Sequence, residues 1–161
     1  MAVCAHFAKA SAFARTARHG DRATVLLQGP NAYVSASLYE DHASQVPTWN
    51  YLAATLRGRL IGPMDRNDTE KLLDALTEEH EAESQEPWSR AALKAEDLAS
   101  MLDAIVGMTL VVERIEFTAK LSQNRSARDR ARVADAFGAR GGPSAELVSW
   151  MRRLGIVRAT S

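Results

Sequence analysis

Four side chains that can donate hydrogen bonds lie close together at the end of a predicted β-strand. They are Lys120, Ser122, Gln123 and Asn124, which supply an ammonium, a hydroxyl and two amides. Such groups donate to phosphate oxygens and to ring carbonyl oxygens, so the cluster is a candidate site for a phosphorylated ligand. The alternative is a solvated strand end in which Asn124 caps the following helix, since asparagine is among the commonest capping residues.

A second candidate lies in the run Thr48-Trp49-Asn50-Tyr51, inside a longer stretch with a period of two. Alternation puts Trp49 and Tyr51 on one face of a strand and Asn50 on the other. Aromatic rings can stack beside a planar heterocycle and an amide can bond its edge, so Thr48, Trp49 and Asn50 are candidate ligand contacts. The alternative is that the two aromatic residues belong to the core or to a dimer interface.

Other catalytic and metal chemistry lacks support in this sequence. Neither a P-loop nor a dinucleotide-binding glycine pattern occurs, so side chains would have to hold a phosphate. The single cysteine, Cys4, allows no intramolecular disulfide, and no His/Cys pair has metal-ligand spacing. We interpret His80 as a packing residue on the apolar stripe of a helix. No catalytic residue and no metal ligand is predicted. Whether the protein is an enzyme stays open, and the interpretation that it is not an enzyme is preferred.

The elements that would position these candidates follow from periodicity and turn residues. Helices are expected over residues 5–17, 67–81, about 98–105, 126–137 and 144–154, with Asn67 capping the second and Gly107 ending the third. Strands are expected over residues 23–28, 32–35, 46–60 and 108–122, with a turn at Gly29-Pro30 between the first two and a change of phase near Glu113 in the last. Because strands arrive in neighbouring pairs with helices between them, we predict an α+β fold with an antiparallel sheet or barrel.

Composition favours one domain over residues 1–161, with a helical insertion at about 65–105 and C-terminal helices at about 125–155. No apolar run has the length of a membrane span and no signal peptide is evident, so no membrane association and a cytoplasmic location are expected. The formal net charge is zero, but it is unevenly distributed: −8 over residues 65–103 and +6 over residues 120–161.

The basic C-terminal segment, residues 120–161, is called the basic tail. It resembles a helix-turn-helix superficially, because its arginines lie on or beside two short predicted helices joined by a glycine-rich turn. That turn is long for the motif, and Asp129, Asp135 and Glu146 interrupt the positive charge. Direct contact with DNA is therefore the less favoured interpretation of this tail, beside an ordinary charged surface.

Three blocks, taken in order, resemble the FMN-binding negative transcriptional regulators of the PaiB type. They are residues 28–35 (QGPNAYVS), residues 46–51 (VPTWNY) and residues 120–124 (KLSQN). The resemblance implies a split β-barrel related to pyridoxamine-phosphate oxidases and flavin reductases, a homodimer, and FMN near the subunit interface. It also implies that seven candidate residues contact the flavin: Thr48, Trp49, Asn50, Lys120, Ser122, Gln123 and Asn124.

The stretch around residues 5–10 resembles a segment that lies well inside members of that family. We therefore expect the barrel to be incomplete at its N-terminus, so that either a partner completes it or FMN binding is weakened or lost. The function implied is that of an FMN-binding protein that regulates transcription negatively. Two alternatives remain: a flavin-dependent oxidoreductase, since flavin chemistry belongs largely to the cofactor, and a truncated barrel that acts as an interaction module without flavin.

Overall fold

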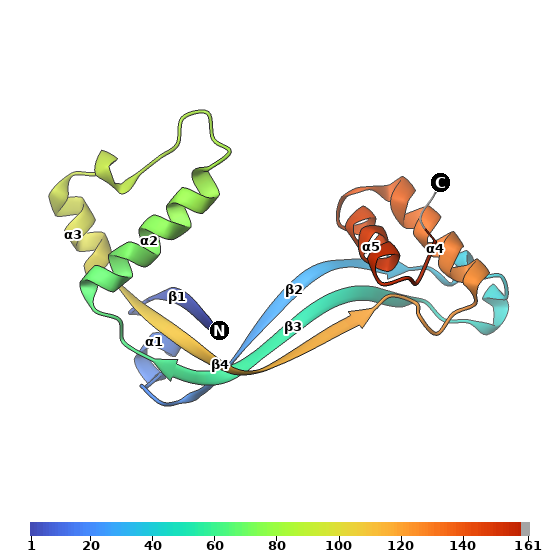
Figure 1. The fold of residues 1–161 in the computed structure, drawn as a ribbon, viewed down its shortest axis with the longest axis horizontal. Coiled ribbons are helices and arrows are strands. Elements are labelled where there is room, and N and C mark those ends of the chain that lie inside the picture. The colour runs from blue at the N-terminus through green and yellow to red at the C-terminus, as the bar shows by residue number, and fades with distance from the viewer. Residues whose placement is uncertain (159–161) are drawn as a thin grey trace. The chain divides into compact units, whose positions relative to one another are not determined.

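The computed structural model describes residues 1–158, and Figure 1 shows its elements in chain order. The strands are β1 (Ala2–Ala8), β2 (Arg22–Val34), β3 (Thr48–Ile61) and β4 (Ile105–Lys120). The α-helices are α1 (Ala12–Thr16), α2 (Arg66–Glu81), α3 (Ala95–Asp103), α4 (Ala127–Arg140) and α5 (Gly142–Arg153), and three short 3-10 turns are η1 (Ala36–Leu38), η2 (His42–Ser44) and η3 (Arg90–Ala92).

The four strands form one antiparallel sheet in the order β1-β4-β3-β2. β1 pairs with β4 from Ala2 opposite Val111 to Ala8 opposite Ile105. Helices enter the chain between β3 and β4 and follow β4. This arrangement confirms the prediction of an α+β fold with an antiparallel sheet and is consistent with a split-barrel FMN-binding fold.

Residue contacts divide the chain into two compact units, each built from two segments. Unit 1 comprises residues 1–25 and 56–114, and unit 2 comprises residues 26–55 and 115–161. The long strands β2, β3 and β4 contribute residues to both units. The assignment of residues 1–161 to one domain stays a prediction.

Unit 1 has a small core in which Leu56, Leu60 and Leu110 are buried. Gly58 lies beside this core on β3, where a Cβ atom would collide with the carbonyl oxygen of Val111, so only glycine allows the two strands this approach. The predicted helix over residues 5–17 is wrong. Residues 2–8 form β1 with strictly alternating exposure, and only Ala12–Thr16 is helical.

Two predicted helix boundaries in unit 1 are also wrong. α2 is capped by Asp65 rather than Asn67, because the Asp65 carboxylate accepts the Asp68 backbone N–H at 2.8 Å. Gly107 lies inside β4 rather than at a helix end. There the Met64 Sδ would lie 2.6 Å from an added Cβ, so close packing accounts for that glycine.

A mostly buried arginine of η3 binds two carboxylates of α2 within unit 1. Arg90, whose side chain is 15% exposed, donates to Asp74 through Nε at 2.7 Å and Nη2 at 2.6 Å, and to Glu70 through Nη1 at 3.3 Å. The hydrogen bond from Arg90, with a contribution from its charge, lowers the pKa of Asp74 below the ordinary value of 3.8. The hydrogen bond that the Asp74 carboxylate accepts raises the pKa of Arg90 in turn.

Because the pKa of Asp74 is lower in the folded state, its contribution to stability is complete above pH 3.8 and is lost as pH falls through the folded-state pKa. We predict that Arg90→Ala raises the pKa of Asp74 toward the ordinary value, as measured by NMR titration of its carboxyl carbon. Lys71→Ala is the control, since Lys71 pairs with Asp68 at 3.1 Å instead. An unchanged Asp74 titration in Arg90→Ala would show that the pair does not persist in solution.

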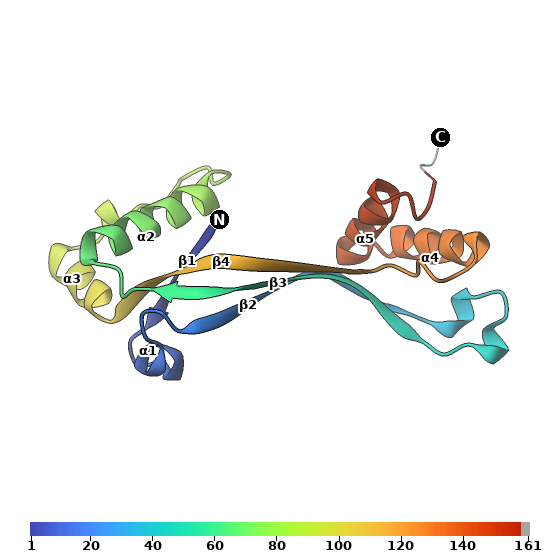
Figure 2. The same cartoon turned by 60° about the horizontal axis from the view of Figure 1, so that its bottom comes forward.

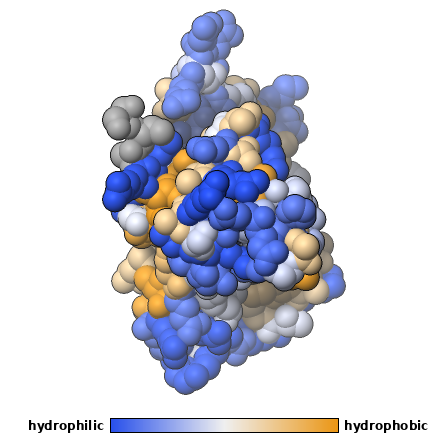
Figure 3. All heavy atoms as spheres, turned by 90° about the vertical axis from the view of Figure 1, so that its right-hand side faces the viewer, coloured by the Kyte–Doolittle hydropathy of each residue, from blue (hydrophilic) through white to orange (hydrophobic). Residues whose placement is uncertain are grey.

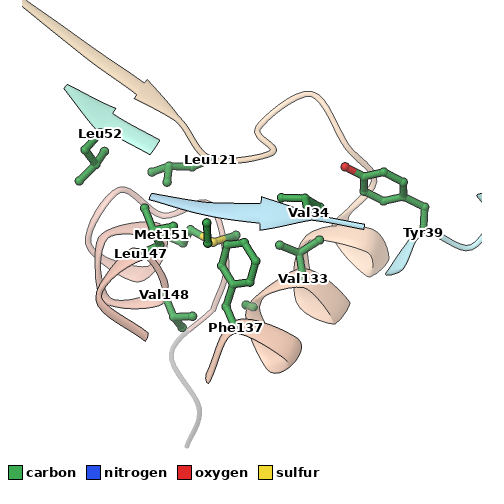
Figure 4. Close-up of a cluster of buried hydrophobic side chains, with 11 residues drawn as sticks. Val34, Tyr39, Leu52, Leu121, Val133, Phe137, Leu147, Val148 and Met151 are labelled. Carbon is green, nitrogen blue, oxygen red and sulfur yellow. The ribbon is translucent and has the colours of Figure 1, made fainter. Parts of the chain in front are cut away.

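Unit 2 has the larger core, and Figure 4 shows its members. Phe137, Leu147, Val148 and Met151 from α4 and α5 meet Val34 of β2, Leu52 of β3 and Leu121 just after β4. Figures 1 and 2 show α4 and α5 side by side. Only Gly141, at φ 74°, separates them, so the predicted long turn over residues 138–143 is wrong.

β2 is one continuous strand, so the predicted turn at Gly29-Pro30 is also wrong. Proline can neither donate to a neighbouring strand nor sit in a sheet centre, but β2 is an edge strand, where it is tolerated.

The predicted change of phase in β4 has a clear cause. Leu110 and Val112 face the core of unit 1, whereas Ala119 of β4 and Leu121 just after it have the other parity and face the core of unit 2.

Candidate functional site

A lysine and a threonine meet where β4 ends and β3 begins. The Lys120 Nζ donates a hydrogen bond to the Thr48 Oγ1 at 2.7 Å, although the two residues are 72 positions apart in the chain. Antiparallel neighbours bring the end of one strand beside the start of the next, which is why these residues come together. Within residues 1–158, no carboxylate forms an ion pair with Lys120, so its charge is available to an anion.

Asn50 and Ser122 form a second pair, but a buried one. The Asn50 Nδ2 donates to the Ser122 Oγ at 3.0 Å, and that hydroxyl lies 3.2 Å from the Asn50 Oδ1, to which it can donate in turn. Both side chains are buried, and Ser122 has the left-handed backbone conformation at φ 62°. The pair therefore fixes the turn after β4 to β3, two residues beyond Lys120.

We predict a coupling energy of about 1 kcal/mol or more between Asn50 and Ser122. Removing either group alone leaves its buried partner unpaired, at a cost of about 1–3 kcal/mol, whereas removing both leaves no orphan. Urea unfolding of Asn50→Ala, Ser122→Ala and the double variant measures the coupling. Purely additive losses would contradict the pairing.

The other two members of the donor cluster behave differently. Gln123 folds back onto its own strand: its Oε1 accepts the Leu121 backbone N–H at 2.6 Å and its Nε2 donates to the Ala119 carbonyl. Asn124 is exposed and does not cap α4. The cap is Ser126, whose Oγ accepts the Asp129 backbone N–H at 3.0 Å, so the alternative with Asn124 as the cap is wrong.

Aromatic side chains lie on the face of β3 that carries its odd-numbered residues. Trp49 is 52% exposed and meets Tyr33 of β2 edge to face, with ring centroids 6.0 Å apart. Tyr51, two residues further along, lines a hollow of about 300 Å³ in unit 2. Trp49 is thus neither buried in the core nor paired away from solvent, and it is available to a planar ligand.

Polar side chains that sequence reasoning missed also line this hollow. They are Gln28 and Asn31 from β2, Thr55 from β3 and Thr118 from β4. Thr118 and Lys120 are two residues apart on β4 and so share one face, opposite Ala119 and Leu121, which pack with the core. We call this surface, with Trp49, Tyr51, Thr118 and Lys120, the open face of unit 2. Thr48, the first residue of β3, has the parity of Asn50 and meets Lys120 at the edge of this face.

The remaining predicted features do not join this site. His80 is exposed at the end of α2, so the interpretation as a packing residue is wrong. Within residues 1–158, no helix is both long enough and apolar enough to cross a membrane.

A sequence model of a protein family, described as "Putative FMN-binding domain", matches residues 1–114. This chain belongs to that FMN-binding family. Over 146 residues the chain is 32% identical to "Protease synthase and sporulation protein PAI 2" of Bacillus subtilis. The aligned region covers 89% of the chain and 68% of that protein. This similarity confirms the predicted resemblance to the PaiB type.

An uncharacterised protein of Emericella nidulans is 28% identical over 131 residues, which is 73% of the chain and 52% of the fungal protein. The part matched by the FMN-binding family contains Thr48, Trp49 and Asn50. Lys120, Ser122, Gln123 and Asn124 lie beyond it. The contacts of Lys120 with Thr48 and of Ser122 with Asn50 therefore join family-matched residues to residues outside the match.

The open face fits the chemistry of FMN. FMN combines a phosphate, which an ammonium and a hydroxyl can bind, with a flat ring system whose edge carries hydrogen-bonding atoms. Lys120 and Thr48 supply the ammonium and hydroxyl for the phosphate. Aromatic, amide and hydroxyl side chains in and beside the hollow supply contacts for the ring system. The buried Asn50 and Ser122 side chains fit a supporting role behind the site.

Proposed function

We propose that this protein binds FMN on the open face of unit 2, with the phosphate held by Lys120 and Thr48 and the ring system beside Trp49 and Tyr51. The observation that carries the proposal is the 2.7 Å contact between Lys120 and Thr48, which brings together a cation and a hydroxyl from two distant chain segments. Bound FMN would supply oxidation and reduction chemistry.

Each candidate residue has its own part in this proposal. Lys120 and Thr48 bind the phosphate, and Trp49 packs against the ring. Asn50 and Ser122 orient the strand end that carries Lys120, since they are buried and bonded to one another. Gln123 holds the same strand end through its bonds to Ala119 and Leu121, and Asn124 is an exposed candidate for a further polar contact.

A regulatory flavoprotein is the function that this similarity favours. The name of the Bacillus subtilis relative connects that protein with protease synthesis and sporulation, and we propose a regulatory role for this chain in which FMN is the ligand or redox sensor. A flavin-dependent oxidoreductase is the second candidate. Oxidation of NADH or NADPH by the protein with FMN would favour the enzyme, and its absence would favour the regulator.

Direct contact between the basic tail and DNA is not part of the proposal, because three arginines at the start of the tail already have partners. Arg128 pairs with Glu40 at 2.6 Å, Arg130 donates to two backbone carbonyls, and Arg125 lies over the Tyr39 ring at 4.4 Å. DNA phosphates would have to displace these groups. A gel shift that weakens steeply with salt would restore DNA binding.

A homodimer also belongs to the proposal. In unit 2 the edge strand β2 exposes Leu26 (60%) and Leu27 (51%), and an edge strand carries backbone groups that another chain can pair with. We propose that two copies associate through this strand. Sedimentation of the wild type and of Leu27→Lys tests it, with a monomeric wild type as the contrary result.

Titration of the purified protein with FMN tests the main proposal. Binding is followed by quenching of flavin fluorescence and by the absorption spectrum of the complex. Saturable binding of one FMN per chain is expected. A colourless protein that does not respond to FMN would favour the third candidate, an interaction module without flavin.

A further inference from the structure

A second hollow in unit 2, of about 540 Å³, lies between α4, the end of α5 and residues 155–158. None of its lining residues lines the open face, so it is a separate feature from the proposed FMN site. Its apolar wall consists of small residues one or two turns apart on α4, Ala127, Ala131 and Ala134, together with Ile156 and Val157.

The wall formed by residues 155–158 is held in place by backbone and side-chain hydrogen bonds. Arg130 donates from Nε to the Ile156 carbonyl and from Nη1 to the Arg125 carbonyl, both at 2.8 Å. The Ile156 N–H donates back to the Met151 carbonyl at 2.8 Å, across Gly155 at φ 68°. These bonds fix the position of this wall, and a wall fixed in advance reduces the entropic cost of binding.

Charge in this hollow is predominantly positive. Among the described residues that line it, Arg130 of α4, Arg152 of α5 and Arg158 are cationic, and Asp135 is the one carboxylate. Guanidinium groups bind carboxylate and phosphate oxygens through paired hydrogen bonds, while the alanine and aliphatic wall offers apolar contact. Figure 3 looks onto the end of the chain that carries α4 and α5, and shows apolar surface among mostly hydrophilic side chains.

We propose that this hollow binds a small amphiphilic anion, a carboxylate or phosphate ester on a short apolar chain. The anionic group pairs with Arg158 and with the N–H groups of Arg130 that its two carbonyl bonds do not use, and the apolar chain lies along Ala127, Ala131 and Ala134. A volume of about 540 Å³ is within the range of small-molecule sites and admits such a ligand. FMN binding is not required for it, so this site and the proposed FMN site can fail independently.

Four probes with one apolar chain and different head groups test the chemistry: octanoate, octyl phosphate, octan-1-ol and octylammonium, each below its micelle concentration. Binding is measured on the full chain by NMR chemical-shift changes. We expect the two anions to shift the amides of Ala131 and Ile156 and to bind at least tenfold more tightly than octan-1-ol, with no saturable binding of octylammonium. Equal binding of octan-1-ol and octanoate would overturn the proposal. The ratio of octanoate to octyl phosphate affinity distinguishes the two anionic head groups.

Two variants with matched controls locate the site. Ala131→Leu fills the hollow and should weaken both anions at least tenfold, whereas Ala139→Leu, on the same helix but outside the lining, should change their affinity less than twofold. Arg158→Gln should weaken them about tenfold, and Arg153→Gln, whose guanidinium lies over the Trp150 ring, should not. Anion binding that survives both Ala131→Leu and Arg158→Gln would place the anion elsewhere and refute the proposal.

Discussion

Phe137→Ala is expected to lower the free energy of unfolding by about 3–5 kcal/mol, the largest loss for a core position of this kind. The Phe137 side chain is fully buried on α4 and lies among Val34, Leu147, Val148 and Met151 in Figure 4. Replacing it removes apolar surface from the core and leaves a cavity that the surrounding side chains can fill only in part.

Urea unfolding followed by circular dichroism measures this loss. Phe117→Ala is the matched control, because Phe117 is 56% exposed on β4 in the same unit and contacts Trp150 with ring centroids 6.3 Å apart. Its loss should be smaller, about 1 kcal/mol. Similar losses for the two variants would show that α4 and α5 do not pack on the strands as described.

Lys120→Ala is expected to weaken FMN binding about 10- to 100-fold, since a hydrogen bond to a charged partner contributes about 1.5–3 kcal/mol. The substitution removes the ammonium but leaves the Asn50–Ser122 pair behind it intact. Flavin fluorescence quenching gives the dissociation constants. Lys94→Ala is the control, because Lys94 is an exposed lysine of unit 1 at the start of α3.

The two longest strands could be predicted from the sequence because their alternation extends over many residues. β3 and β4 each contain more than a dozen residues, and the change of phase in β4 is visible in the sequence as a change of apolar parity. β1 was not predictable in the same way. Phe7, Ala10 and Phe13 have helical spacing, yet pairing with β4, about a hundred positions away, decides the conformation of residues 2–8.

The candidate site could be predicted in part for the same reason. Lys120 and Thr48 were identified by residue type, but their contact depends on β3 and β4 being neighbours, which no local pattern states. Burial of Asn50 and Ser122 depends on the same pairing. Gln28, Asn31 and Thr118 lack an unusual local pattern, and only the hollow that they line with Tyr51 makes them candidates.

A thermodynamic cycle with two proteins and two ligands tests the central claim, that Lys120 and Thr48 form the phosphate site of a flavin. Wild type and Lys120→Ala are each titrated with FMN and with riboflavin, which lacks the phosphate. The account predicts that wild type prefers FMN by about 10- to 100-fold and that Lys120→Ala loses most of this preference while its affinity for riboflavin is nearly unchanged. An equal preference for FMN in both proteins would contradict it.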